Sequence, residues 1–243
     1  MRALLAQLAS VPGQTQANAD RAVEILGLHP DVEIAVFPEL YLGGYDLSLV
    51  PRSARAPDSP ELRAIAAAAL AASTAVVVGF AERAEDGRLF NSVACIDRDG
   101  SLAGVYRKTR LFGAEPDVFQ AGDEHGVVRL AGLDVGPLIC FDIEFPEPAR
   151  ELAAAGAELL VTASANMAPF GPDHEVASRA RALENRLPHL YANGVGAIGG
   201  FQLVGGSRSV DASGLVLAEA GSDAEALLVV PVGLPGLIIG ASP

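Results

Sequence analysis

The feature that most constrains the fold of this chain is a succession of short apolar runs separated by segments with helical spacing. The runs are rich in β-branched residues and are bounded by turn-forming residues, as β-strands are. They occupy residues 33–39, 74–82, 91–97, 134–140, 157–164 and 189–196. Strands that are apolar throughout are typical of sheets covered on both faces. The runs therefore predict buried sheets.

Helical spacing fills much of the sequence between these runs. The segments that carry it are 15–28, 59–73, 145–156 and 173–186. Ser59 precedes Pro60 at the start of the second segment, and Pro146 and Pro148 lie in the first turn of the third. Proline is well tolerated in the first turn of a helix, so both starts are well marked.

Glycine-containing turn signals predict hairpins between several of the strands. These signals lie at 84–91, 97–101 and 211–214, and each has glycine at or near the position that a tight turn requires. Since hairpins leave some strands without a covering helix, the pattern predicts an α/β fold with two packed sheets and outer helices. With no linker, low-complexity tract or tandem repeat, we predict one domain over residues 1–243, with a short tail from about residue 231.

Charge and composition exclude several classes of partner. The 243 residues include 17 basic and 30 acidic side chains, for a net charge of -13. Nucleic acid or an anionic membrane would repel such a surface. We therefore expect neither as a partner and expect a small-molecule substrate instead.

The two ends of the chain are apolar, but neither predicts a membrane anchor. The opening "MRALLAQLASVPG" is a short run broken by Gln7, without a clear cleavage pattern, and we interpret it as the first strand. The final apolar stretch contains Pro231 and Pro235 and is too short to cross a bilayer core of about 30 Å as a helix. The two cysteines, Cys95 and Cys140, make no disulfide framework, so we predict a reducing, cytoplasmic location.

Cys140 lies in "GPLICFDIEFPE", where an apolar strand meets an acidic turn. A free cysteine is most often a buried structural residue, and Cys95, inside a strand-like run, fits that role. Cys140 differs because it ends a strand shortly before a helix that starts near Pro146. Ligands and nucleophiles gather at such strand ends, and a helix N-terminus favours a thiolate. A nucleophilic role and a structural role both remain open on these grounds.

A nucleophilic cysteine needs a base, and either a histidine or a carboxylate can supply it. The histidines are His29, His125, His174 and His189, and nothing in their spacing marks any of them. A buried carboxylate with a raised pKa is the alternative. Glu39 follows the apolar run in "AVFPELYLGGYD", at the rim of a strand.

The segment "YRKTRLFGAEPDVF" adds two further charged candidates. Lys108 directly follows a short strand, and Glu115 lies just beyond a turn at Gly113. A basic run of this kind is usually a solvated face. The strand ends that carry Glu39, Lys108 and Cys140 make one site only if the fold brings them together, which periodicity cannot show.

Taken together, these segments resemble the nitrilase superfamily of carbon–nitrogen hydrolases. "FPEL" carries Glu39, "YRKTRLFGAEPDVFQAG" carries Lys108 and "LICFDIEFPEPAR" carries Cys140, in the family's order and at comparable spacing. The resemblance extends from the first residues to about "EALLVV". It implies a four-layer α-β-β-α sandwich and an enzyme that uses no cofactor and no metal.

The resemblance also implies a role for each residue of the site. Glu39 is the expected general base, Lys108 the cation that stabilises the tetrahedral oxyanion, and Cys140 the nucleophile. Glu115 is the second glutamate, which orients the lysine. The backbone N–H of Phe141 would assist Lys108.

The sequence at Cys140 and just after it resembles that of the small-amide amidases, a branch of the family that includes ω-amino amide hydrolases. Glu144 is a candidate lining residue of the substrate pocket on this ground. Asn166, Phe170 and Tyr45 are further candidates for substrate binding, with packing as the equal alternative. For Asp142 we expect a structural role at the start of the helix.

Two departures from the family pattern affect the expected assembly and substrate. Such amidases usually carry a longer, charged C-terminal tail that helps dimers associate, so the geometry of the expected homodimer or higher homo-oligomer is open. Gly194 and Val195 stand where relatives often show a basic residue and a cysteine. This change concerns the surroundings of the pocket.

The sequence thus predicts a cysteine-dependent amidase that hydrolyses a small linear carboxamide through a thioester. Nitrile, N-carbamoyl amino acid and dipeptide-like substrates are alternatives within the family, because pocket shape separates them. A non-catalytic binding protein and a cysteine–histidine hydrolase using His174 or His189 are alternatives of other classes. A metal hydrolase is poorly supported, because no H-E-x-x-H or C-x-x-C pattern occurs.

Overall fold

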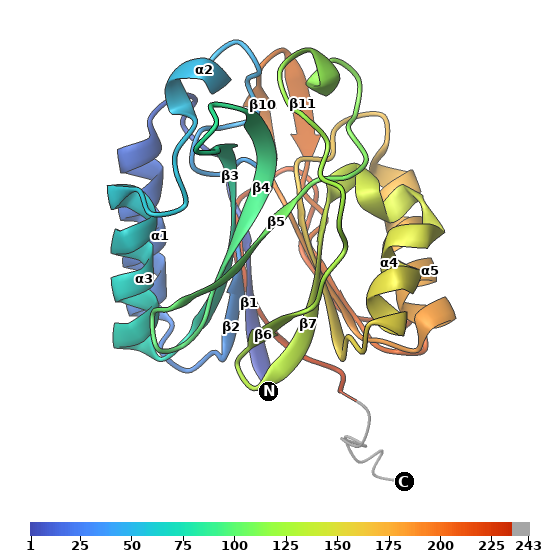
Figure 1. Ribbon diagram of the computed structural model, residues 1–243. Coiled ribbons are helices and arrows are strands. Elements are labelled where there is room, and N and C mark those ends of the chain that lie inside the picture. Colours follow the sequence, from blue (N-terminus) through green and yellow to red (C-terminus); the bar gives the residue numbers. More distant parts are fainter. Residues whose placement is uncertain (235–243) are drawn as a thin grey trace, which may run out of the picture.

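The computed structural model describes residues 1–234, in which two six-stranded sheets pack face to face between outer helices (Figure 1). The first sheet has the order β14-β1-β2-β3-β4-β5 and the second β13-β12-β9-β8-β7-β6. Strands of the first sheet are β1 (Arg2–Gln7), β2 (Ile34–Val36), β3 (Ala75–Arg83), β4 (Leu89–Ile96), β5 (Leu102–Arg107) and β14 (Ala226–Pro231). Strands of the second are β6 (Val128–Leu130), β7 (Leu133–Ile139), β8 (Leu159–Ser164), β9 (His189–Asn193), β12 (Arg208–Val210) and β13 (Val216–Glu219). A separate hairpin joins β10 (Val195–Ile198) to β11 (Phe201–Val204).

The helices form the two outer layers. In Figure 1, α1 (Thr15–Leu28) and α3 (Pro60–Ala72) cover one side, and α4 (Pro146–Ala154) and α5 (Gly171–Asn185) cover the other. Short helical turns are α2 (Val50–Ser53), η1 (Glu115–Asp117) and η2 (Cys140–Glu144). The predicted four-layer α-β-β-α sandwich is confirmed.

Local signals in the sequence explain where the main elements begin and turn. Ser59 caps α3 by accepting a hydrogen bond from the Leu62 amide at 3.4 Å, with Pro60 in the first turn. The predicted turns at 97–101 and 211–214 join β4 to β5 and β12 to β13 as antiparallel pairs. The opening run forms β1, which pairs with β14 and β2.

The core between the sheets is built from the inward faces of both. Val77 and Val93 of the first sheet and Val135 and Val161 of the second are completely buried in one cluster. Burial of each such side chain stabilises the fold by about 1.5–3 kcal/mol. This core gives the strand ends above it a rigid support.

Three predicted strands end earlier than their apolar runs. β2 stops at Val36, so Glu39 lies in the following turn, and β7 stops at Ile139, so Cys140 begins η2. The run 189–196 breaks at Gly194 into β9 and β10. Gly194 packs closely against β11, since a Cβ there would lie 2.7 Å from Leu203 Cδ1.

The predicted tail is only partly visible. Pro231 ends β14, and residues 235–243 lie outside the described residues. Across residues 1–234, the helices lack the length and apolar composition that a membrane crossing requires.

Candidate active site

The ends of strands from both sheets place Glu39, Lys108 and Cys140 in one buried cluster. Glu39 follows β2, Lys108 directly follows β5, and Cys140 directly follows β7. The Lys108 ammonium lies 2.6 Å from Glu39 Oε1 and 2.9 Å from Glu115 Oε1, and the three side chains are fully buried. The structure thus brings together the charged residues that the sequence singled out.

The turn that carries Glu39 depends on a glycine in the neighbouring strand. A Cβ on Gly79 of β3 would lie 2.2 Å from the Pro38 carbonyl oxygen and 2.7 Å from Glu39 Cα. Glycine alone allows this approach. Glu39 is then held from the second sheet as well, because the Ala165 amide donates to its Oε2 at 2.9 Å.

Asn91 and Tyr45 complete the surroundings of the two glutamates. The Asn91 Nδ2 group donates to Glu39 Oε1 at 2.7 Å and to Glu115 Oε1 at 3.1 Å. The Tyr45 hydroxyl donates to Glu115 Oε1 at 2.9 Å, and the Phe112 amide to its Oε2 at 2.8 Å. Glu115 is therefore fixed from several sides and holds Lys108 in place.

Cys140 lies on a sharp turn with an unusual backbone. Its φ is +44°, in the left-handed region that costs a non-glycine residue roughly 1–2 kcal/mol. Asp142 holds this turn, since its Oδ2 accepts from the Ile139 amide at 2.9 Å and from the Tyr106 hydroxyl at 2.8 Å, and its Oδ1 accepts from the Arg110 amide at 2.9 Å. Asp142 has the structural role expected from the sequence. It also joins the turn at Cys140 to the segment that follows Lys108.

Burial shifts the pKa values of the cluster. Burial disfavours the charged ammonium of Lys108. The negative charges of Glu39 and Glu115 have the larger effect and raise the pKa of Lys108 well above its ordinary value. For Glu39, burial raises the carboxyl pKa, against the opposing charge of Lys108. Burial and the nearby Glu39 raise the pKa of the Cys140 thiol well above its usual range. The resting cysteine is therefore a neutral thiol.

A narrow pocket opens over Cys140. Its lining residues are Tyr45, Phe112, Cys140, Phe141, Glu144, Asn166, Met167, Phe170 and His174. Phe112 contacts Phe141 and Phe170 edge to face, with ring centroids 5.3 and 5.9 Å apart. Tyr45, Glu144, Asn166 and Phe170, the candidates for substrate binding, therefore all line this pocket, and so does Phe141, which the sequence also marks as a substrate-binding candidate. The lining is mainly apolar and aromatic.

Two of these residues also hold the walls of the pocket. Asn166 Nδ2 donates to the Phe170 carbonyl at 3.0 Å, and its Oδ1 accepts from the Met167 amide at 2.9 Å. Glu144 Oε1 lies 3.2 Å from His174 Nε2. This contact joins the Glu144 side chain to α5 on one side of the pocket.

The two candidate histidine bases are occupied elsewhere. His189 lies 2.7 Å from Thr162 Oγ1 and 2.9 Å from the Ser178 carbonyl, and burial lowers its pKa to about 4. His174 contacts Glu144 and Tyr191. Within residues 1–234, neither histidine makes a hydrogen bond or ion pair with Cys140. Both cysteines are free thiols.

Sequence reasoning missed Asn91, Ser164 and Tyr191. Asn91 opens a run that was interpreted only as a strand, and its polar side chain inside an apolar sheet was the available signal. Ser164 and Tyr191 lie in strands whose apolar neighbours concealed them. No group of three or more potential metal ligands occurs among the described residues.

Comparison with known proteins agrees with this geometry. The family model of the carbon-nitrogen hydrolases matches residues 2–237. An (R)-stereoselective amidase from a Pseudomonas species is 40% identical over 226 residues, covering 92% of this chain and 82% of the relative. A protein of Pseudomonas protegens described as a hydrolase in the pqqF 5' region is 41% identical over 233 residues, covering 94% and 81%.

Solved structures show the same architecture. A variant of the amidase from Nesterenkonia sp. AN1, with the acetamide moiety of fluoroacetamide on its active site cysteine, superposes with a TM-score of 0.87 at 28% identity, covering 95% of this chain and 89% of that one. Another variant, in complex with butyramide, gives a TM-score of 0.88 at 28% identity, covering 95% and 90%.

Fold and sequence together define a nitrilase-type hydrolase that acts on carbon–nitrogen bonds. The chain belongs to the carbon-nitrogen hydrolase family. Its relatives and structural neighbours identify it as an amidase-like enzyme.

Proposed function

We propose that this enzyme hydrolyses a small linear carboxamide to a carboxylic acid and ammonia through a thioester on Cys140. The observation that carries the proposal is the buried Lys108 ammonium between Glu39 and Glu115, at 2.6 and 2.9 Å, in the cluster that contains Cys140. A buried cation between two buried carboxylates is costly to assemble. Its position suits the stabilisation of negative charge that develops on a substrate oxygen.

In the first half of the proposed reaction, Glu39 accepts the proton of the Cys140 thiol as the sulfur attacks the amide carbon. Negative charge moves to the substrate oxygen, where Lys108 and the backbone N–H of Phe141 stabilise it. The carbon–nitrogen bond then breaks, the nitrogen takes the proton from Glu39, and ammonia leaves. The raised pKa of Glu39 supports this role, because a carboxylate with a raised pKa is a stronger base than an ordinary one.

In the second half, water hydrolyses the thioester. Glu39 removes a proton from the water, whose oxygen attacks the thioester carbon. The carbon–sulfur bond breaks, the carboxylic acid leaves, and the sulfur regains its proton from Glu39, which returns to the carboxylate form. Glu115, held by Tyr45 and Asn91, keeps Lys108 in place through both halves.

The lining of the pocket supports an uncharged, apolar acyl group. Phe112, Phe141 and Phe170 form its aromatic wall, and Glu144 is paired with His174. Short aliphatic amides such as butyramide suit this aromatic wall.

The test is ammonia release from a panel of short aliphatic amides, ω-amino amides, N-carbamoyl amino acids and nitriles, with Cys140→Ala alongside. We expect release from aliphatic amides by the native protein, and a loss on the order of 10³-fold or more in the variant. Preference for nitriles or N-carbamoyl amino acids would replace the proposed substrate class. Equal release by Cys140→Ala would contradict the proposed nucleophile.

We further propose that the enzyme works in the cytoplasm as a homodimer or higher homo-oligomer. The free thiols of Cys95 and Cys140 suit a reducing compartment, and the resemblance to dimeric amidases supports association. Size-exclusion chromatography with light scattering tests the assembly, and a monomer at working concentration would contradict it.

A further inference from the structure

A row of hydrogen bonds leads from Asp142, which holds the turn at Cys140, to an exposed carboxylate on α4. The Thr109 hydroxyl donates to Asp142 Oδ1 at 3.2 Å, and Thr109 Oγ1 lies 2.9 Å from His125 Nε2. His125 Nδ1 lies 2.8 Å from Glu151 Oε2. The side chain of His125 is 9% exposed, whereas that of Glu151 is 61% exposed. His125 therefore connects solvent-exposed charge to the residue that supports the turn.

Asp142 fits this row as an ionised carboxylate. Its Oδ1 accepts from Thr109 and from the Arg110 amide, and its Oδ2 accepts from the Ile139 amide and the Tyr106 hydroxyl. Burial raises the pKa of Asp142. A carboxylate has about four acceptor positions, however, and four donors occupy them, so an added proton would displace a donor. Thr109 therefore gives its only hydroxyl proton to Asp142.

The three hydrogen bonds of the row need three protons, because the carboxylates at both ends only accept. The Thr109 hydroxyl supplies one of them to Asp142, so its oxygen must accept from His125 Nε2. Glu151 must likewise accept from His125 Nδ1. Both ring nitrogens donate only in the protonated imidazole. The complete row therefore exists only while His125 carries a positive charge.

Loss of one proton from His125 breaks the row at a defined place. Both ends are charged acceptors, but the contact of Nδ1 with Glu151, at 2.8 Å, is shorter than that of Thr109 with Asp142, at 3.2 Å. The carboxylate beside Nδ1 therefore fixes the tautomer of the neutral ring. Nε2 then becomes an acceptor, and the Thr109 hydroxyl turns to it and leaves Asp142.

We propose that His125 is a positioning residue of the active site, which keeps Thr109 on Asp142, and with it the turn at Cys140, only while its ring is protonated. Thr109 also directly follows Lys108, so the same row bears on the segment that carries the proposed oxyanion cation. Activity should then fall as the pH rises through the titration of His125. The inference rests on the proposed function of Cys140 and Lys108.

The titratable and charged groups around His125 come from its own segment and from three other elements. They are Asp123 and Glu124 before it in the chain, Glu151 of α4, Tyr106 of β5, and Asp142 of η2 through Thr109. The Tyr106 and His125 ring centroids are 6.0 Å apart. Burial raises the pKa of Tyr106 well above its ordinary value, so its hydroxyl remains a donor to Asp142 throughout the test.

The test follows His125 and Asp142 by NMR over a pH titration, without substrate. Long-range ¹H–¹⁵N spectra give the midpoint at which the His125 ring loses its proton, with His125→Gln to assign the signal. We expect both ring nitrogens to be protonated below this midpoint and Nδ1 alone above it. The Arg110 amide, which donates to the same oxygen of Asp142 as Thr109 does, should shift with the same midpoint.

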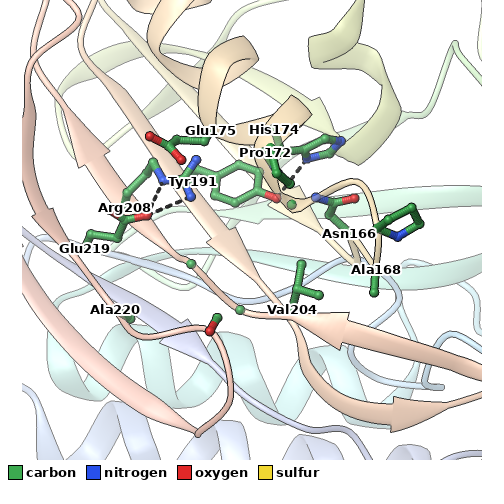
Figure 2. Close-up of a pocket in the computed structure, with 15 residues that line it drawn as sticks. Asn166, Ala168, Pro172, His174, Glu175, Tyr191, Val204, Arg208, Glu219 and Ala220 are labelled. Atoms are coloured by element: carbon green, nitrogen blue, oxygen red, sulfur yellow. Dashed lines mark hydrogen bonds and ion pairs between the residues drawn. The ribbon is translucent and has the colours of Figure 1, made fainter.

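A second histidine near the pocket serves as the internal control. His174 contacts Tyr191 beside a cavity of about 480 Å³ (Figure 2). Within residues 1–234, it makes no hydrogen bond to a member of the row. The Arg110 amide should therefore not follow the titration of His174.

Two variants separate the row from the charge of the ring. Thr109→Val keeps His125 and its charge but removes the hydroxyl, so the Arg110 amide should no longer follow the ring. In Glu151→Gln, the new amide can donate to Nδ1, so a neutral ring can donate to Thr109 through Nε2 and the row stays complete at every pH. The matched control is Glu147→Gln, which removes the same charge one turn earlier on α4 and should keep the native behaviour.

Steady-state kinetics with butyramide give the functional readout. In the native protein, kcat should fall by about threefold to tenfold as the pH rises through the His125 midpoint, because Asp142 loses one hydrogen bond. KM should change less, because the lost bond supports the turn and not the lining of the pocket. Thr109→Val should have the lower kcat on both sides of the midpoint, and Glu151→Gln the higher kcat on both.

An Arg110 amide that ignores the His125 midpoint, or one that still follows it in Thr109→Val, would overturn the inference. A level kcat across the midpoint in the native protein, or a native fall in Glu151→Gln, would do the same. Glu151 is exposed, so its variant keeps the test informative if Thr109→Val fails to fold. Absence of butyramide hydrolysis by the native protein would contradict the proposed function and leave the NMR readout intact.

Discussion

Cys140 lies between two sides that are equally buried but differ in charge. The first sheet and its loops supply Glu39, Lys108 and Glu115, three ionisable groups in direct contact. The second sheet supplies Ser164 and Tyr191, whose hydroxyls form hydrogen bonds without an ion pair. The charged side holds groups that can move a proton and stabilise an oxyanion, whereas Ser164 and Tyr191 offer only neutral hydroxyls. Variants on the two sides should therefore differ, with turnover most affected on the charged side and stability on the neutral side.

Lys108→Met should produce the largest effect on the charged side. We expect kcat/KM to fall by about 10²–10³-fold or more, since the cation stabilises the oxyanion. Removing it also leaves two buried carboxylates unpaired, at a cost of about 3–5 kcal/mol in stability. Steady-state kinetics and thermal denaturation measure both. If kcat/KM stayed within tenfold of the native value, Lys108 would not be the group that stabilises the oxyanion.

Asn91→Ala should produce a smaller effect on the same side. Asn91 donates to both glutamates, and its hydrogen bond lowers the pKa of Glu39 against the effect of burial. Its loss should raise that pKa further, so the acidic limb of kcat/KM should move to higher pH by about one unit, with about tenfold lower activity on that limb. A pH profile measures the shift, and an unchanged acidic limb would contradict this role.

Phe170→Ala tests the pocket that the two sides share. Phe170 is 36% exposed and packs against Phe112, so its removal widens the pocket near its opening to solvent. We expect the preference for hexanamide over butyramide to rise by about tenfold, since one methylene is worth about 1–3 kcal/mol in a fitted pocket. The ratio of kcat/KM values measures it. An unchanged ratio would show that the acyl group of the substrate does not lie beside Phe170.

The smallest effect concerns stability on the neutral side. Burial lowers the pKa of His189 to about 4, below the value of about 6.5 in an unfolded chain. The unfolded state therefore takes up a proton first as the pH falls, and stability is lost from about pH 6.5 downward, by about 2 kcal/mol at pH 5. His189→Asn should flatten this dependence in denaturant titrations at pH 7 and pH 5. An equal change in the free energy of unfolding between pH 7 and pH 5 in the native protein and the variant would contradict His189 as the cause.

The charged side was largely predictable from sequence, because its residues follow apolar strands in recognisable segments. Glu39, Lys108 and Glu115 each lie beside a strand or a turn that the pattern marks. Their convergence was not predictable, because it depends on how the two sheets face each other and on the space that Gly79 leaves for the Glu39 turn. The family resemblance supplied that step.

The neutral side was nearly invisible in the sequence. Ser164 and Tyr191 lie within buried strands, where their polar groups meet only through the pairing of β8 with β9. His174 was weighed as a base, yet its position was set by the packing of α5 against the second sheet. Pairing and packing over long sequence separations leave no local signal. The strands β6, β11, β12, β13 and β14 were not expected as separate elements, because each is at most six residues long and gives little periodicity.

The most direct test of the account is to quench the enzyme with acid during turnover of butyramide and map acylated peptides by mass spectrometry. We predict a butyryl thioester on the peptide that contains Cys140, absent in Cys140→Ala, and no acylation of Cys95. Ammonia release with acyl groups on another residue, or undiminished release by Cys140→Ala, would contradict the central role of Cys140.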